Sequence, residues 1–166
     1  MSDAPARHPQ YAEAKTAAVR LLASRARTRA DLEEHLRSRG LEPEAINQAL
    51  DDLARAGYVD DEQYARERVE DLLQGSRRGA PVLVQKLIGD GLPEDLAERV
   101  VAERLADEDS REWALDAARE RLPRLQGLER ETARRRLFGY LTRRGFDTTE
   151  ALRATDEVLP ALDEDY

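Results

Sequence analysis

The sequence contains no cysteine, which excludes disulfide bonds, thiol nucleophiles and cysteine-ligated zinc or iron–sulfur sites. A chain without disulfides fits a reducing compartment, so we expect a cytoplasmic protein. No stretch of about 18 consecutive apolar residues occurs, and the sequence therefore predicts no membrane span. Aromatic residues make up only 5% of the chain, which leaves few rings that could stack on single-stranded bases.

Charge, in contrast, is abundant. Charged residues make up 37% of the chain and hydrophobic residues 40%, enough Leu, Ala and Val for a folded protein. The formal net charge of −8 disfavours a protein that coats nucleic acid non-specifically, because the summed field repels phosphate. It still allows local basic patches. The length of 166 residues permits one compact domain or an array of smaller units.

Apolar residues recur at steps of three and four residues through most of the chain, as on one face of an α-helix. A clear example is the stripe formed by Ile46, Ala49, Leu50 and Leu53. No stretch alternates apolar and polar residues in the manner of a strand, so we predict an all-α fold. Thr28 is a predicted N-cap. Pro123 interrupts one stripe, and we expect the helix there to end near Leu122.

A glycine follows three of the amphipathic stretches, at Gly40, Gly91 and Gly145, where a left-handed residue can end a helix. A leucine stands four residues before each glycine, and a large apolar residue follows it directly. The intervals of 51 and 54 residues lie in the range of repeat proteins. We therefore predict three tandem three-helix repeats that form an elongated array, with room for curvature along its length.

This pattern divides the chain into five parts. We expect a disordered N-terminal segment over residues 1–10, which also lacks the apolar core of a signal peptide. The first, second and third repeats are expected over residues 11–57, 58–107 and 108–160, and an acidic tail over residues 161–166.

Clustered basic residues are the best candidates for contacts with a partner or with DNA. Arginine suits this role, because its planar fork pairs bidentately with carboxylate or phosphate. The alternative is a solvated face, or cations that complement a helix C-terminus. The candidate residues are Arg25, Arg27, Arg29, Arg37, Arg39, Arg77, Arg78, Lys86, Arg134, Arg135, Arg136, Arg143 and Arg144.

The segment over residues 57–65 combines two aromatic rings with an acidic helix start. Asp60 and Gln63 have the spacing of a capping box, and Asp61 also lies in the first turn. We interpret Tyr58, Asp60, Asp61 and Tyr64 as a structural junction between the first two repeats, with the rings filling it. A partner-recognition corner is the alternative.

The residues offer little to an enzyme. No glycine-rich phosphate loop is present, and His8 and His35 lie far apart in the sequence. Adjacent acidic pairs point about 100° apart on a helix, so they do not converge on one atom. We therefore expect no catalytic residue, no metal site and no cofactor.

Three blocks of the sequence resemble the RecX family of bacterial regulators of the RecA recombinase. The most specific is Gly-Tyr-Val-Asp-Asp-Glu-Gln-Tyr-Ala at residues 57–65. Residues 18–25 resemble the family's opening helix and residues 28–32 its next helix start, although Asp31 stands where Glu is commoner. Residues 134–146 resemble its last-repeat block. The resemblance covers roughly residues 14–159.

The resemblance implies an all-helical protein that binds the groove of the RecA–DNA filament and suppresses strand exchange, ATP hydrolysis and co-protease activity. Our first hypothesis is accordingly a non-enzymatic, monomeric regulator that binds the RecA filament, with weak DNA contact as an addition. The rival hypothesis is a direct nucleic-acid-binding helical repeat protein. An enzyme is the remaining alternative.

Overall fold

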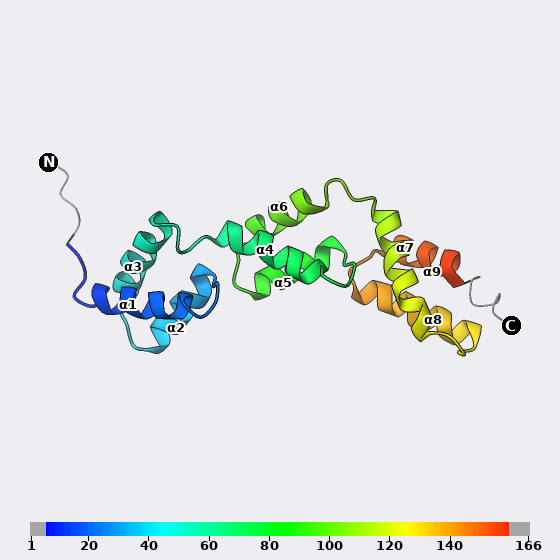
Figure 1. The fold of residues 1–166 in the computed structure, drawn as a ribbon, viewed down its shortest axis with the longest axis horizontal. Coiled ribbons are helices and arrows are strands. Elements are labelled where there is room, and N and C mark those ends of the chain that lie inside the picture. The colour runs from blue at the N-terminus through cyan, green and yellow to red at the C-terminus, as the bar shows by residue number, and fades with distance from the viewer. Residues whose placement is uncertain (1–5, 160–166) are drawn as a thin grey trace.

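The computed structural model describes residues 6–159, and within them the chain is helical with no strand. Figure 1 shows three helix triplets that follow one another along the long axis. Unit one comprises α1 (Tyr11–Leu22), α2 (Arg29–Ser38) and α3 (Pro43–Arg55). Unit two comprises α4 (Asp61–Leu73), α5 (Ala80–Gly89) and α6 (Glu94–Leu105). Unit three comprises α7 (Ser110–Arg121), the 3-10 turn η1 (Leu122–Arg124), α8 (Arg130–Arg143) and α9 (Thr148–Val158).

The all-α prediction is confirmed, and so is the effect of Pro123. Helix α7 ends at Arg121, and the chain continues as a 3-10 turn because proline cannot donate the next helical hydrogen bond. The predicted disorder is wrong for residues 6–10. There the His8 N–H donates to Gln48 Oε1 at 2.8 Å, and the Glu42 N–H donates to Gln10 Oε1 at 2.9 Å. Residues 1–5 and the predicted tail over residues 161–166 lie outside the described residues.

Side-chain caps mark several helix starts. Thr28 Oγ1 accepts from the Asp31 N–H at 3.1 Å, and an Asp60 carboxylate oxygen accepts from the Gln63 N–H at 2.9 Å. Each cap satisfies a backbone donor that has no partner inside the helix. The caps therefore place the first turn of α2 and α4 where the sequence predicts.

The repeated glycines end the second helix of each unit. Gly40, Gly91 and Gly145 have φ values of +80°, +90° and +90°, in the left-handed region that favours glycine. The apolar residue after each glycine is buried and donates its N–H to the leucine carbonyl five residues earlier, closing a Schellman turn. This turn sets the direction in which the third helix leaves.

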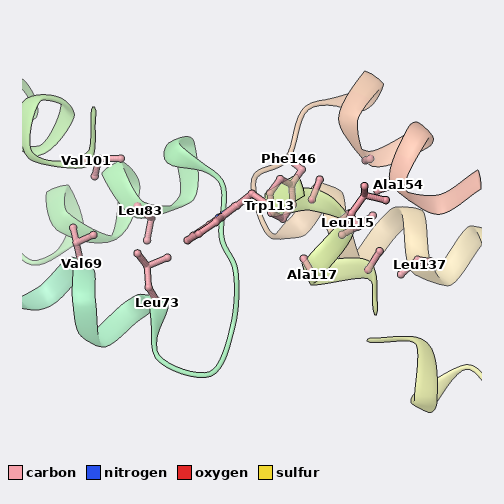
Figure 2. Packing of buried hydrophobic residues seen from close by; sticks show 14 of the residues in the cluster. Val69, Leu73, Leu83, Val101, Trp113, Leu115, Ala117, Leu137, Phe146 and Ala154 are labelled. Atoms are coloured by element: carbon pink, nitrogen blue, oxygen red, sulfur yellow. The ribbon is translucent and has the colours of Figure 1, made fainter. Parts of the chain in front are cut away.

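Two hydrophobic cores lie along the array. The first is confined to unit one and to Val59, which follows α3. The second is continuous through units two and three. Figure 2 shows Trp113 reaching from α7 toward Leu73 and Leu83 of unit two, with Phe146 close to its base.

Unit one meets unit two where the start of α2 abuts the end of α5, a contact that we call the first joint. Thr28 Oγ1 donates to the Asp90 carbonyl at 2.9 Å. The Arg29 N–H donates to Asp61 Oδ1 at 2.8 Å. A Cβ added to Gly91 would lie 2.9 Å from Ala30 Cβ, so the glycine lets the two helices approach closely.

Unit two meets unit three in the same way, where the start of α5 abuts the end of α8. At this second joint the Gly79 N–H donates to the Arg144 carbonyl at 2.8 Å. The Trp113 indole N–H donates to the Arg78 carbonyl at 2.9 Å. The N-caps Thr28 and Gly79 have nearly identical dihedrals, with φ of −73° and −74° and ψ of 157° and 156°. The array therefore uses one joint geometry twice.

Gly79→Ala should destabilise the second joint. The new Cβ would lie 2.1 Å from the Gly145 carbonyl oxygen, and backbone must shift to relieve that contact. We expect the free energy of unfolding to fall by about 1–3 kcal/mol. Gly89→Ala is the control, because its Cβ meets nothing within 4 Å and alanine favours a helix by about 0.5–1 kcal/mol. Urea unfolding measures both, and equal stability of the two variants would contradict the proposed clash.

Asp61 and its neighbour Glu62 have pKa values shifted in opposite directions. Burial at the first joint raises the pKa of Asp61, and the Arg29 N–H offsets this only in part. Hydrogen bonds from Arg99 and Arg66 lower the pKa of the half-buried Glu62. The ionised form of Asp61 is therefore disfavoured by folding, whereas the ionised form of Glu62 is favoured.

Neutral substitutions of these two residues should thus have opposite effects on stability. Asp61→Asn removes a burial cost that is present when pH exceeds the folded pKa, so this variant should be more stable than wild type at neutral pH. Glu62→Gln loses favourable pairing and should be less stable there. The Asp61 difference should vanish as pH falls below the ordinary pKa of an aspartate, about 3.9, and the Glu62 difference only as pH falls through the lowered pKa of Glu62 in the folded state. Thermal melts across pH test this, and a shared sign at pH 7 would refute it.

Candidate partner-binding surface

The structure divides the predicted basic residues by whether the chain itself neutralises them. The residues at the first joint are largely neutralised. Arg27 Nη1 lies 2.6 Å from Asp31 Oδ2, and Arg25 Nη2 lies 3.9 Å from the same oxygen. Arg29 pairs with Glu33 at 2.9 Å and with Asp51 at 2.8 Å. These three arginines therefore hold unit one together and have little charge left for a partner.

The residues at the second joint are less well paired. The Arg77 guanidinium lies 4.3 Å from the Trp113 ring centroid and 3.7 Å from Asp116 Oδ2. Arg78 Nε donates to the Leu72 carbonyl at 2.8 Å, and the Arg144 guanidinium lies 5.1 Å from the Tyr140 ring centroid. Burial, followed by the charge of Arg144, lowers the pKa of Arg78.

No carboxylate among residues 6–159 lies within 4.0 Å of a guanidinium nitrogen of Arg78 or Arg144. A cleft of about 350 Å³ beside this joint is lined by Arg78, Trp113 and Phe146 and by the acidic residues Glu108, Asp147 and Glu150. The acids of this cleft thus leave both guanidinium groups without an ion pair.

The remaining candidates lie on the outer parts of α2, α5 and α8. Arg134 is neutralised by Asp156, with Nε 3.0 Å from Oδ1. Within the described part of the chain, the others are exposed and have no ion-pair partner; they are Arg37, Arg39, Lys86, Arg135, Arg136 and Arg143. Arg37 and Arg39 stand at the free C-terminus of α2, and Arg135 and Arg136 lie on α8.

The four predicted junction residues differ in position. Asp61 takes part in the first joint, Asp60 caps α4, and Tyr64 lines a cleft of about 230 Å³ at this joint. Tyr58 is 68% exposed, so the expectation that its ring fills the junction is wrong. Val59 is buried in its place.

Sequence reasoning missed three residues of the second joint, Trp113, Arg121 and Tyr140. The Arg121 guanidinium lies 5.0 Å from the Tyr140 ring centroid, on the same ring that Arg144 contacts. Trp113 stands at the same place in α7 as Tyr64 does in α4, and this match between repeats could have revealed it.

The histidines and acidic residues over residues 6–159 do not gather into a metal-binding group. His8 and His35 contact backbone and neighbouring side chains rather than each other. In the described part of the chain, no three His, Cys, Asp or Glu side chains are grouped as metal ligands would be. None of the helices over residues 6–159 combines the length and apolar character needed to cross a bilayer.

Comparison with known proteins places the chain among characterised relatives. Residues 14–53 match the family model described as "RecX, first three-helix domain". The chain is 36% identical over 140 residues to the regulatory protein RecX of Amycolatopsis mediterranei, an alignment that covers 82% of this chain and 78% of the relative. It is 34% identical over 151 residues to the regulatory protein RecX of Thermobifida fusca, covering 91% and 81%.

A solved structure shares the fold. The crystal structure of RecX from Lactobacillus salivarius superposes with a TM-score of 0.72 at 21% identity, covering 93% of this chain and 97% of that one. The repeated triplets, the two joints and the sequence relatives thus agree, and the chain belongs to the RecX family of regulatory proteins.

Proposed function

We propose that this protein binds the RecA–DNA filament and inhibits its recombinase, ATPase and co-protease activities. Family membership supports this proposal, because relatives are named regulatory protein RecX and the family resemblance implies RecA as the target. The structural observation that carries it is the distribution of unneutralised cations over all three units, from Arg37 and Arg39 at one end to Arg135 and Arg136 near the other.

The elongated form suggests inhibition by occupancy. An array of three units can contact neighbouring protomers of a filament at the same time, so several weak contacts combine into tight binding. A body lying along the filament would exclude the second DNA or the co-protease substrate. It would also restrict the protomer movements that ATP turnover requires.

This mode of action needs binding alone. The protein forms and breaks no covalent bond in it, requires no cofactor, and acts as a monomer in the cytoplasm, where RecA filaments form.

Direct binding to nucleic acid is the second candidate function. The second joint favours it, because Arg78 and Arg144 lack a carboxylate partner among the described residues. The net charge of −8 and the low aromatic content oppose it. DNA affinity without RecA separates the two functions: a steep salt dependence that flattens in the Arg134→Ala, Arg135→Ala, Arg136→Ala triple variant would favour direct binding.

ATP hydrolysis by RecA on single-stranded DNA tests the first function. The wild-type protein should slow hydrolysis. The double charge reversal Arg135→Glu, Arg136→Glu should raise the half-inhibiting concentration by about tenfold, because it converts two attractive contacts into repulsive ones.

The matched control is Arg20→Glu, Arg153→Glu, which makes the same charge change at two other exposed positions without ion pairs in the described structure. It should inhibit as wild type does. Unaltered RecA hydrolysis at saturating wild-type protein would exclude the proposed function. Equal weakening by both double variants would exclude the α8 surface.

A further inference from the structure

The two joints share a geometry but differ in charge. Arg27 and Arg78 each directly precede an N-cap, Thr28 or Gly79. The Nε of each donates to the carbonyl six residues earlier, at 3.4 Å for Arg27 and 2.8 Å for Arg78. The same arginine is therefore held in the same way at both joints.

At the first joint, two carboxylates neutralise two arginines. Asp31, one turn after Arg27, lies 2.6 Å from its Nη1. Asp90, the C-cap of α5, lies 2.8 Å from Arg68 Nε. Arg27 and Arg68 each have an ion-pair partner at this joint, and Asp31 also lies 3.9 Å from Arg25 Nη2.

At the second joint, both carboxylates are replaced. Val82 stands one turn after Arg78, where Asp31 stands after Arg27. The C-cap of α8 is Arg144, where α5 has Asp90. Arg68 has its counterpart in Ala117, since each residue follows the joint aromatic by one helical turn. Within residues 6–159, Arg78 and Arg144 thus remain without an ion pair, although Glu108, Asp147 and Glu150 line the adjoining cleft.

Hydrogen-bonding capacity is also unused at the second joint. Arg144 Nη1 and Arg77 Nε are buried and have no hydrogen-bond partner. Tyr140 holds the Arg144 guanidinium from one direction, which fixes its position without neutralising it. Buried donors of this kind are normally satisfied, and an unsatisfied one calls for an explanation.

We propose that the second joint is a binding site for the oxyanion of a phosphate ester, held between Arg78 and Arg144. One guanidinium can satisfy both oxygens of a planar carboxylate side by side. A tetrahedral phosphate presents oxygens in different directions and can bridge two guanidinium groups that come from different helices. The site takes either a backbone phosphate of nucleic acid or the phosphate of a free nucleotide.

The inference goes beyond RecA regulation and is tested on the protein alone. Trp113, the single tryptophan of the chain, donates to the Arg78 carbonyl and lies under Arg77, so its fluorescence reports on this joint. Inorganic phosphate, thymidine triphosphate and oligothymidylate are the probes. We expect each to produce a saturable change in the wild-type protein.

Two variants remove the site. Val82→Asp places a carboxylate one turn after Arg78, as in the first joint, and Arg144→Gln removes one guanidinium. Each should weaken binding of the probes roughly tenfold, because each removes or neutralises a charged hydrogen-bond partner. Arg20→Gln makes the same change in net charge on exposed α1 and should bind as wild type does. Thermal melts check folding, and Arg144→Gln decides the matter if Val82→Asp does not fold.

The probes also distinguish the source of the phosphate. Tighter binding of oligothymidylate than of thymidine triphosphate assigns the site to nucleic acid, and the reverse order assigns it to a nucleotide. The proposal fails if no probe saturates, or if Arg20→Gln weakens binding as much as the joint variants do. It also fails if an oligoglutamate peptide binds more tightly than every phosphate probe, since the ligand would then be a protein carboxylate.

Discussion

Each unit is joined to the next where the N-terminus of one second helix meets the C-terminus of the following one, and the shape of the array depends on this contact. A left-handed glycine allows the approach, at Gly91 against Ala30 and at Gly145 against Val82. A donor at the N-cap then bonds the C-cap carbonyl, from the Thr28 hydroxyl or from the Gly79 N–H. Because the positive end of one helix dipole faces the negative end of the next, the contact is also electrostatically favourable.

This polarity gives the array two different ends. At one end the C-terminus of α2 is free, and Arg37 and Arg39 complement its negative dipole. At the other end, the start of α8 meets no second helix of another unit among residues 6–159, and the Glu129 carboxylate accepts from the Glu131 and Thr132 N–H groups. The Glu129 carboxylate thus satisfies backbone donors that have no partner inside α8.

Much of this architecture could be predicted from the sequence, because helix periodicity, caps and terminal glycines are local signals. Thr28, the three repeated glycines and the break at Pro123 all act where the sequence places them. Tyr58 was mispredicted because the sequence does not show which of the two adjacent apolar residues after Gly57 is buried, and the buried one is Val59.

The candidate site was less predictable, because the ion pairs of an arginine depend on which acidic side chains the fold brings near it. Arg29 and Arg78 belong to equivalent clusters in the sequence. Only the fold brings Asp51 of α3 to Arg29 and leaves Arg78 beside Arg144. A basic cluster therefore becomes informative only when the positions of the acids around it are known.

The division of the hydrophobic residues into two cores has a consequence for local opening. Unit one buries its own apolar residues, whereas units two and three share one cluster through Trp113. Separation at the first joint breaks polar bonds at Thr28 and Arg29 and exposes neither core. We therefore expect two cooperative folding units, with amide hydrogen exchange in unit one proceeding independently of the remainder.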